Sequence, residues 1–429
     1  MKTIVDNPNI NYMELLKRPV ENDIEIKSRV REMLEMVRNQ GDEALKTLTK
    51  KFDGVDVESF EIGWQEMVNS KNLVDESLKN SIAVAARNIE AFHSAQKAND
   101  IEVETMPGVK CKLVYRPLKR VGLYIPGGTA PLISTVLMLG IPARIAGCED
   151  LIVCTPPPVN SIILYACSLV NARVFTVGGA QAIAAMAFGT ESIPKVDKIF
   201  GPGNSYVTEA KMQVAALGLP IDIPAGPSEL LVISDESAEP QFIAADLLSQ
   251  AEHGIDSQVV LISTSDAIIA GTLNEIDKQV NVLPRKEIAL KALENSWSIK
   301  VETLEKAVEI SNLYAPEHLI LSVSNPETLV SRIENAGSVF LGNYTPESAG
   351  DYASGTNHTL PTSGFARNWS GVNLLSFTKT ISFQKITPAG LNSLGYHITA
   401  LAEAEKLTAH ANAVQIRLSK LKKDGYDDN

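Results

Sequence analysis

The stretch Val121-Gly122-Leu123-Tyr124-Ile125-Pro126-Gly127-Gly128 joins a short apolar strand to a turn made of proline and glycine. The same pattern recurs three times downstream, at residues 151–158, 174–179 and 198–203, and a helical stretch follows each turn. Four strand–turn–helix units in succession are typical of a parallel α/β sheet. Because ligands of such sheets bind at the carboxyl ends of the strands, the glycine-rich turns mark a candidate binding edge.

A second α/β series occupies the following part of the chain. Apolar runs predict buried strands at residues 230–234, 259–263, 319–323 and 338–341. The sequence therefore predicts an α/β protein with two parallel sheets.

Mainly helical segments flank the two series. The apolar spacing predicts helices up to about residue 55, with a break at Gly41-Asp42, and a further helix over residues 81–97. A Pro107-Gly108 turn before an alternating segment predicts a hairpin. A last helix is predicted over residues 400–421.

The composition is that of a globular protein. The chain has 429 residues, 45% of them hydrophobic, which is enough for two or more cores. A formal net charge of -12 argues against nucleic acid or an anionic membrane as a partner. The N-terminus lacks the apolar core of a signal peptide, so we expect a cytoplasmic protein. The longest apolar stretch, residues 131–148, is interrupted by glycine, proline and arginine and is a poor membrane span.

The cysteines predict neither a disulfide framework nor a thiolate metal site. They lack CxxC spacing and lie in apolar surroundings, at positions Cys111, Cys148, Cys154 and Cys167. We interpret them as reduced packing residues. Cys154 is the one candidate nucleophile, and no histidine lies near it in sequence.

Polar side chains that suit metal binding close the helical run before Gly254. Gln250 and His253 stand three residues apart, so on a helix they share one face. An amide oxygen and an imidazole nitrogen on one face can be two ligands of one metal ion. A polar helix end that faces water explains the same pattern.

Three further groups of residues offer acids, bases or ligands. Glu317 and His318 are adjacent at a strand entrance, point to different sides, and could serve two separate proton transfers. Residues 348–358, rich in small side chains, contain Asp351 and His358. Each of these stretches could also be an ordinary polar loop.

The terminal helix carries the last group. Glu405 and His410 fall off its apolar face, where a histidine is most often simply exposed. Taken together, Gln250, His253, Asp351 and His410 would form a nitrogen and oxygen ligand set that suits a catalytic zinc, and also cobalt or manganese.

The chain resembles the histidinol dehydrogenase family through nearly its whole length. The resemblance rests on eight segments in the correct order: residues 121–128, 177–183, 201–204, 222–229, 249–254, 315–319, 351–358 and 407–410. Thr356 stands where the family pattern has proline, which affects loop stiffness more than chemistry.

The resemblance implies an activity and a fold. The activity would be the NAD-dependent oxidation of L-histidinol through L-histidinal to L-histidine, with a homodimer that shares its active site between subunits. The fold would be two Rossmann-like domains without the GxGxxG fingerprint, plus small helical terminal segments. We expect an N-terminal arm (1–22), a catalytic and zinc domain (23–122 and 230–372), an NAD-binding domain (123–229) and a C-terminal dimerisation segment (373–429).

Residue roles are implied in the same way. The zinc ligands would be Gln250, His253, Asp351 and, from the partner subunit, His410. The acid/base pair would be Glu317 and His318. Positions that contact NAD would be Tyr124, Gln181 and Asn204. The substrate site would comprise Ser228, His318, Glu405 and the four metal ligands, with His358 nearby. Two alternatives are a zinc hydrolase that uses Glu317 without a nucleotide and a non-catalytic α/β binding protein.

Overall fold

The fold was derived from a computed structural model that describes residues 1–19, 24–127, 131–223 and 226–424. It comprises two compact units, of which the first spans Met1–Gln96 and Leu118–Phe377 and the second spans Lys97–Pro117 and Thr378–Asn429. Gly128 of the predicted turn, residues 224–225 of a family segment and the predicted boundary at 22/23 lie outside the described residues.

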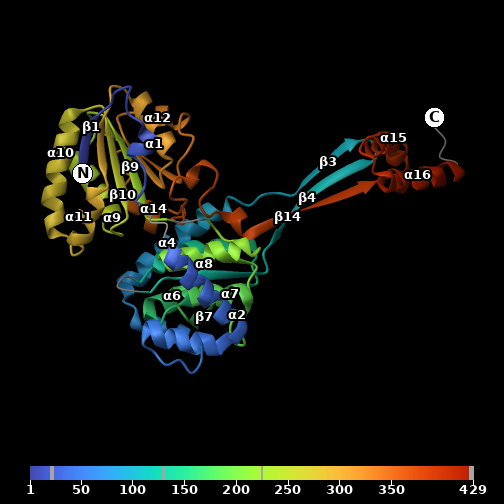
Figure 1. The fold of residues 1–429 in the computed structure, drawn as a ribbon, viewed down its shortest axis with the longest axis horizontal. Helices are drawn as coiled ribbons and strands as arrows, with labels where there is room; N and C mark the ends of the chain where they lie inside the picture. The colour runs from blue at the N-terminus through green and yellow to red at the C-terminus, as the bar shows by residue number, and fades with distance from the viewer. Residues whose placement is uncertain (20–23, 128–130, 224–225, 425–429) are drawn as a thin grey trace. The chain divides into compact units, whose positions relative to one another are not determined.

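The first unit contains a six-stranded parallel sheet (Figure 1). In spatial order its strands are β1 (Lys2–Val5), β11 (Trp297–Lys300), β10 (Gln258–Ser263), β9 (Glu229–Ser234), β12 (His318–Ser322) and β13 (Ser338–Leu341). The four strands predicted from the second apolar series are confirmed. After β1, the chain returns to this sheet at β9, places β10 and β11 on one side of it and later adds β12 on the other side. The strand order therefore reverses between β9 and β12.

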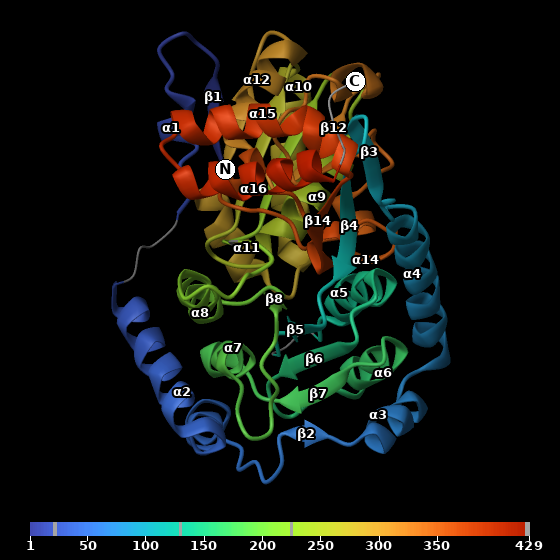
Figure 2. The same cartoon turned by 90° about the vertical axis from the view of Figure 1, so that its right-hand side faces the viewer.

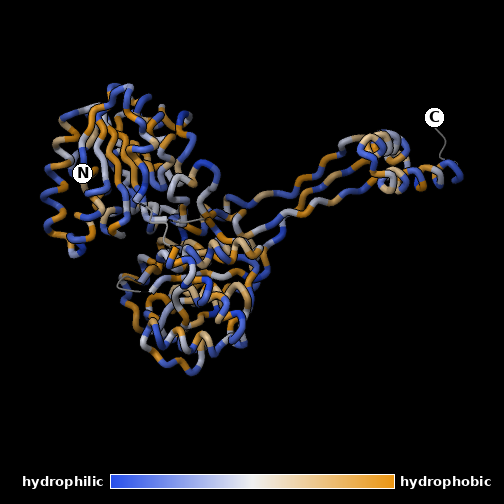
Figure 3. Tube along the Cα trace, viewed as in Figure 1, coloured by the Kyte–Doolittle hydropathy of each residue, from blue (hydrophilic) through white to orange (hydrophobic). Residues whose placement is uncertain are grey.

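Helices cover both faces of this sheet because its strands are apolar on both sides. Alternate strand residues pack either against one helical layer, α9 (Pro240–Ala251), α10 (Asp266–Gln279) and α11 (Lys286–Glu294), or against the other, α1 (Tyr12–Leu15), α12 (Leu304–Tyr314) and α13 (Glu327–Val330). A short helix, α14 (Glu347–Tyr352), follows β13. The hydropathy colouring shows the strands as the apolar layer (Figure 3).

A five-stranded sheet forms the rest of the first unit (Figure 2). Its strands in spatial order are β2 (Glu61–Ile62), β7 (Arg173–Thr176), β6 (Asp150–Thr155), β5 (Arg120–Tyr124) and β8 (Lys198–Phe200). All pairs are parallel except β2 with β7. The four predicted strand–turn–helix units are confirmed here, and the strand order reverses between β5 and β8.

Two helical layers cover the five-stranded sheet. One comprises α2 (Ile24–Asp53), α7 (Gly179–Phe188) and α8 (Ser205–Ala216). The other comprises α3 (Trp64–Ser70), α4 (Glu76–Ser94), α5 (Ile133–Ala146) and α6 (Ser161–Leu169). Gly41, with φ 54°, interrupts α2 at the predicted break. The first unit also contains short 3-10 helices, η1 (Lys71–Leu73), η2 (Val280–Val282), η3 (Phe365–Arg367) and η4 (Leu374–Phe377).

This packing differs from the predicted grouping, which joined residues 23–122 to the zinc domain. The apolar stripe of α2, including Val30, Leu34 and Leu45, is buried against α7 and α8 of the five-stranded sheet. Strand β1 also joins the six-stranded sheet instead of forming a separate arm. An amphipathic stripe indicates that a helix is packed, but it does not indicate which sheet receives it.

The second unit combines a three-stranded antiparallel sheet with two helices. The sheet has the order β14 (Thr378–Ile386), β4 (Val109–Pro117), β3 (Ile101–Met106). The predicted hairpin at Pro107-Gly108 is confirmed as β3 and β4. In place of one predicted helix over 400–421, α15 (Pro388–Ala404) and α16 (Thr408–Lys423) lie side by side (Figures 1 and 2). Lys406, with φ 61°, lies in the turn between them.

Within the described residues, no helix is both long and apolar enough to cross a lipid bilayer.

The assignment of α2 to the five-stranded sheet predicts the effect of a core substitution. Leu45→Ala removes a fully buried side chain from the α2–α7 contact, so it should lower the free energy of unfolding by about 2–5 kcal/mol. The matched control Leu73→Ala, at a side chain that is 75% exposed, should change it by less than about 0.5 kcal/mol. Urea unfolding of both variants checks this, and an equal effect would contradict the packing.

Candidate functional site

A buried cluster of ionisable side chains lies at the amino end of the six-stranded sheet. His318, the first residue of β12, is 3% exposed. Its Nδ1 atom lies 3.1 Å from the carbonyl oxygen of Glu229, the first residue of β9. Because a carbonyl only accepts, a neutral His318 carries its proton on Nδ1 and leaves Nε2 basic. That Nε2 atom lies 3.7 Å from a carboxylate oxygen of Glu347 and 3.7 Å from one of Asp351.

Glu317 contacts the other peptide group of Glu229. Its Oε2 atom accepts a hydrogen bond from the Glu229 backbone N–H at 2.9 Å. The same oxygen lies 3.6 Å from His318 Nδ1, so the two neighbours do not point apart as predicted. Glu317 and His318 therefore both contact the backbone of Glu229, at the end of the β9–β12 pairing. This one residue holds the acid/base pair.

Glu347 belongs to the cluster although the sequence did not single it out. It is the first residue of α14, is 1% exposed, and accepts a hydrogen bond from Ser249 Oγ at 3.0 Å. An acid after a proline is typical of an ordinary first helical turn. The signal that could have identified it is its spacing, because Glu347 and Asp351 are four apart and share one face of α14.

Burial and mutual repulsion shift the pKa values in the cluster. Burial raises the pKa of Glu317 to about 8, and burial together with the nearby Asp351 raises that of Glu347 to about 7. For His318, burial lowers the pKa, but the carboxylates around it outweigh this and raise it to about 10. For Asp351, burial raises the pKa, and the His318 imidazole brings it down to about 2. Three carboxyl groups face one imidazole, so the site favours a bound cation.

The donor atoms of His318, Glu347 and Asp351 all lie within 4.8 Å of one another, close enough to hold a metal ion. His318 Nε2 and Glu347 Oε1 are buried and lack a hydrogen-bond partner among the described residues. Orphaned buried acceptors of this kind suit a divalent cation. The group overlaps the predicted ligand set only at Asp351.

Two other predicted ligands, Gln250 and His253, lie in the last turn of α9 and just beyond it. Gln250 is buried in the last turn of α9, beside Glu347, whose pKa its amide lowers. Helix α9 ends at Ala251, so His253 lies in the turn beyond it and not on the predicted helical face. His253 is nevertheless close enough to Asp351 and His318 for their charges to affect its pKa.

The remaining substrate candidates divide between the units. Ser228 directly precedes Glu229 at the amino end of β9. His358 connects Asp351, whose carbonyl lies 3.1 Å from its Nδ1, to Thr135 of α5, whose Oγ1 lies 3.1 Å from its Nε2. Glu405 and His410 belong to the second unit, where both are exposed around the start of α16. Their part in the site stays a prediction.

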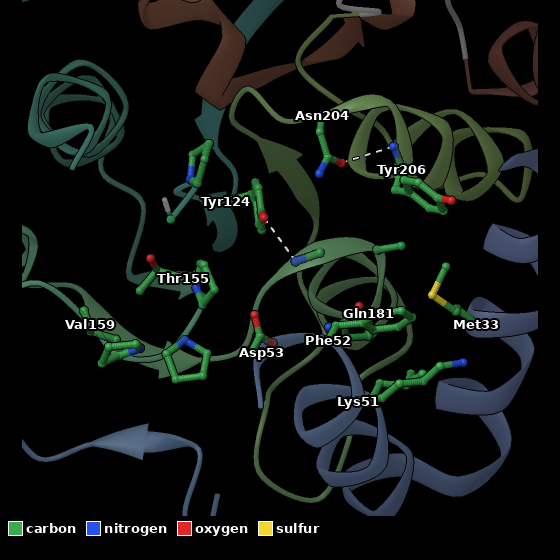
Figure 4. A pocket seen from close by; sticks show the side chains of 18 of the residues that line it. Met33, Lys51, Phe52, Asp53, Tyr124, Thr155, Val159, Gln181, Asn204 and Tyr206 are labelled. Atoms are coloured by element: carbon green, nitrogen blue, oxygen red, sulfur yellow. Dashed lines mark hydrogen bonds between the residues drawn. The ribbon is translucent and has the colours of Figure 1, made fainter. Parts of the chain in front are cut away.

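A cavity of about 1470 Å³ lies at the carboxyl ends of the five-stranded sheet. All three residues predicted to contact NAD line it: Tyr124, Gln181 and Asn204 (Figure 4). Tyr124 ends β5, and Asn204 follows β8, so they flank the point where the strand order reverses. Cavities at this position are the usual ligand sites of open α/β sheets.

Hydrogen bonds fix two of these side chains. The Tyr124 hydroxyl accepts a hydrogen bond from the N–H of Gly179, which begins α7, at 3.1 Å. Asn204 caps α8 by accepting from the N–H groups of Tyr206 and Val207, both at 3.1 Å. Its amino group is then available to a ligand in the cavity. Helices α7 and α8 both begin at this edge, and their N-termini favour an anionic group.

Comparisons with known proteins agree with this arrangement. The family model described as histidinol dehydrogenase matches residues 16–418. The chain is 50% identical over 425 residues to a histidinol dehydrogenase of Haemophilus influenzae, covering 98% of this chain and 100% of that protein. The crystal structure of histidinol dehydrogenase from Elizabethkingia anophelis superposes with a TM-score of 0.96 at 50% identity, covering 98% of this chain and 99% of that one.

A longer relative also matches. The chain is 52% identical over 419 residues to a putative bifunctional histidine biosynthesis protein of Photorhabdus laumondii, and it spans 52% of that protein's length.

The raised pKa of Glu317 predicts a pH-dependent stability. Folded Glu317 holds its proton to about pH 8, whereas an unfolded glutamate releases it near 4.5. Between these values the unfolded state binds fewer protons, so the free energy of unfolding falls as the pH rises. In metal-free protein, Glu317→Gln lacks the ionisable group, so its free energy of unfolding should not fall in this way. The free energy of unfolding of the variant relative to wild type should therefore rise between pH 5 and pH 8, by on the order of a few kcal/mol.

Urea unfolding at pH 5, 6.5 and 8 measures the difference between Glu317→Gln and wild type. The control is Glu58→Gln, at an exposed glutamate, which should leave the difference from wild type constant over pH. If the difference between Glu317→Gln and wild type is also constant over pH, the carboxyl group of Glu317 is not buried and protonated as described.

Proposed function

We propose, from the premise that this chain belongs to the histidinol dehydrogenase family, that it oxidises L-histidinol through L-histidinal to L-histidine with NAD as the electron acceptor. The observation that carries the proposal is the buried Glu317–His318 pair, held by both peptide groups of Glu229 and facing two further carboxylates. Oxidising an alcohol to an acid needs one base for the alcohol and one group for water, and this pair supplies both.

The oxidation proceeds in two steps. The alcohol loses a proton from oxygen and a hydride from carbon, which gives the aldehyde. Water adds to the aldehyde, and the hydrate loses a second proton and a second hydride, which gives the carboxylic acid. Ionisation of that acid releases a third proton and leaves the carboxylate. Two NAD molecules each accept one hydride, so four electrons leave the substrate.

His318 is the proposed base for the alcohol proton. Its Nδ1 proton is engaged by the Glu229 carbonyl, so Nε2 is the atom that faces the substrate space. Glu317 is proposed to activate the water that hydrates the aldehyde, because its carboxyl group is oriented by the Glu229 N–H. The positive charge of a bound metal ion would favour the ionised form of Glu317 that this role needs. Both groups are buried, which limits competing water in the site.

The cluster also fits a zinc ion. We propose Gln250, His253 and Asp351 as ligands, with His410 contributed by the second subunit of a homodimer and Glu347 directly beside them. The fit rests on the excess of carboxylates and on Glu347 Oε1, a buried oxygen without a hydrogen-bond partner among the described residues. When bound, such an ion would supply the positive charge that lowers the pKa of His318 toward neutrality and that binds the amine and imidazole of histidinol.

The cavity of the five-stranded sheet is the proposed NAD site. Its volume exceeds the roughly 300–1,000 Å³ typical of small-ligand pockets, so it accommodates an extended dinucleotide. The helix N-termini of α7 and α8 would face the pyrophosphate, and Gln181 and Asn204 offer amide groups for hydrogen bonding. A zinc hydrolase would have no use for this second cavity, so the dehydrogenase is favoured.

The second unit is the proposed dimerisation segment. Large apolar side chains are exposed on its sheet and helices: Ile381, Phe383, Tyr396, Leu401, Leu407 and Ile416. A cluster of exposed apolar side chains typically marks a protein interface. We also expect substrate contacts from Ser228 and Glu405, with His358 nearby, and a cytoplasmic location.

The function is tested by coupling NADH formation to product analysis. Metal-replete protein should form two NADH for each L-histidine from L-histidinol. Glu317→Gln should slow the second oxidation, started from L-histidinal, by about 100-fold while slowing the first much less, because only the second needs activated water. Equal losses in both steps would refute the role of Glu317, and no NADH from wild-type protein would refute the function.

Subunit mixing tests the shared zinc site. His410→Asn and Asp351→Asn should each lose most metal and activity, while the control His397→Asn, on the neighbouring helix α15, should retain both. If His410 comes from the partner, mixed dimers of the first two variants hold one intact site, and random reassembly restores about one quarter of wild-type activity. No recovery after confirmed exchange would place His410 in its own chain's site or outside the site.

A further inference from the structure

Arg18, in the N-terminal segment, contacts Glu229, whose backbone holds the acid/base pair. The Arg18 guanidinium donates to both carboxylate oxygens of Glu229, from Nε at 2.6 Å and from Nη2 at 2.8 Å. It also lies 3.9 Å from the centre of the Tyr314 ring. The side chains of Arg18 and Glu229 are only 15% and 2% exposed. Bidentate pairing combined with stacking fixes the guanidinium in one orientation.

Arg18 also holds the turn that leads to Glu317. Its Nη2 atom donates to the carbonyl oxygens of Tyr314 at 2.8 Å and Ala315 at 3.4 Å. Ala315 adopts φ 53°, a left-handed conformation that costs energy for a residue with a Cβ atom. Since Pro316 alone separates Ala315 from Glu317, the contact with Arg18 fixes the direction in which the chain enters β12.

Glu229 transmits this contact to both members of the pair. Its carboxylate is held by Arg18 and by the N–H of Ser363, at 2.6 Å from Oε1. Its own N–H orients the Glu317 carboxylate, and its own carbonyl orients the His318 imidazole. Glu229 therefore links its own side chain, which Arg18 holds, to the two backbone groups that orient the acid/base pair.

The structure assigns to Arg18 and Glu229 the role of positioning residues for proton transfer. They touch neither reacting group through their side chains, yet they fix the peptide and the turn that hold Glu317 and His318. Stability alone is a weak reason for such a pair, because buried ion pairs contribute little net stability compared with apolar residues. The kinetic part of this inference rests on the proposed function.

The test compares Arg18→Ala with a matched control. Arg173→Ala removes an equally bidentate pair, with Glu61 at 2.8 and 3.0 Å, on the five-stranded sheet. Arg18→Ala should lower kcat by about 100-fold, because small misplacements of catalytic groups have effects of this size. The KM values for histidinol and NAD should stay within about threefold of wild type, and the control should retain wild-type kcat.

Guanidinium rescue separates positioning from folding. Guanidinium at non-denaturing concentration should restore much of the kcat of Arg18→Ala, because the ion can occupy the vacated place beside Glu229, and it should not raise that of Arg173→Ala. Arg18→Lys keeps the charge without the fork geometry and should lose about tenfold in kcat. If Arg18→Ala does not fold, the kcat of Arg18→Lys tests the proposal instead. A wild-type kcat in Arg18→Lys would overturn it.

Hydrogen–deuterium exchange without substrate gives a readout independent of activity. In Arg18→Ala, peptides covering residues 226–232 and 314–320 should exchange faster, while peptides of the five-stranded sheet stay unchanged. An unaltered kcat in folded Arg18→Ala overturns the proposal. A loss of kcat that guanidinium does not restore, together with faster exchange throughout the chain, also overturns the proposal. If wild-type protein forms no NADH, the proposed function fails, and the exchange result still decides whether Arg18 fixes these segments.

Discussion

Parallel pairing of β9 with β12 is the interaction on which the candidate site depends. The register sets His318 opposite Leu230, so the peptide groups of Glu229 lie at the edge of the pairing. The side chains of Glu317 and His318 take the hydrogen bonds that a longer strand would have made. The acid/base pair is thus part of the sheet's own hydrogen-bonding pattern, which explains how two adjacent residues can be held in one place.

The two sheets offer different environments to two ligands. The amino end of the six-stranded sheet is crowded with buried carboxylates, which suits a cation and a basic substrate. The carboxyl end of the five-stranded sheet offers a cavity and two helix N-termini, which suit a phosphate-containing cofactor. His358 connects the two regions, because it contacts both Asp351 and Thr135 of α5. Substrate and cofactor would meet along this connection.

Much of the fold was predictable because short apolar strands before glycine or proline turns have few other interpretations. The family segments also identified the residues that line the cavity. Glu347 was missed because a buried carboxylate and an exposed one have the same sequence pattern. The grouping of α2 was missed because its stripe of Val30, Leu34 and Leu45 fits either sheet. The convergence of Glu317 and His318 depends on Glu229, 88 residues before Glu317, and sequence spacing carries no such information.

Anomalous X-ray scattering at the zinc edge, from crystals soaked with zinc and L-histidinol, locates the metal and the substrate relative to the acid/base pair. We expect one strong peak per subunit within coordination distance of Asp351, with histidinol between that peak and His318. A peak elsewhere, or histidinol bound away from His318 in protein that forms NADH, would contradict this expectation.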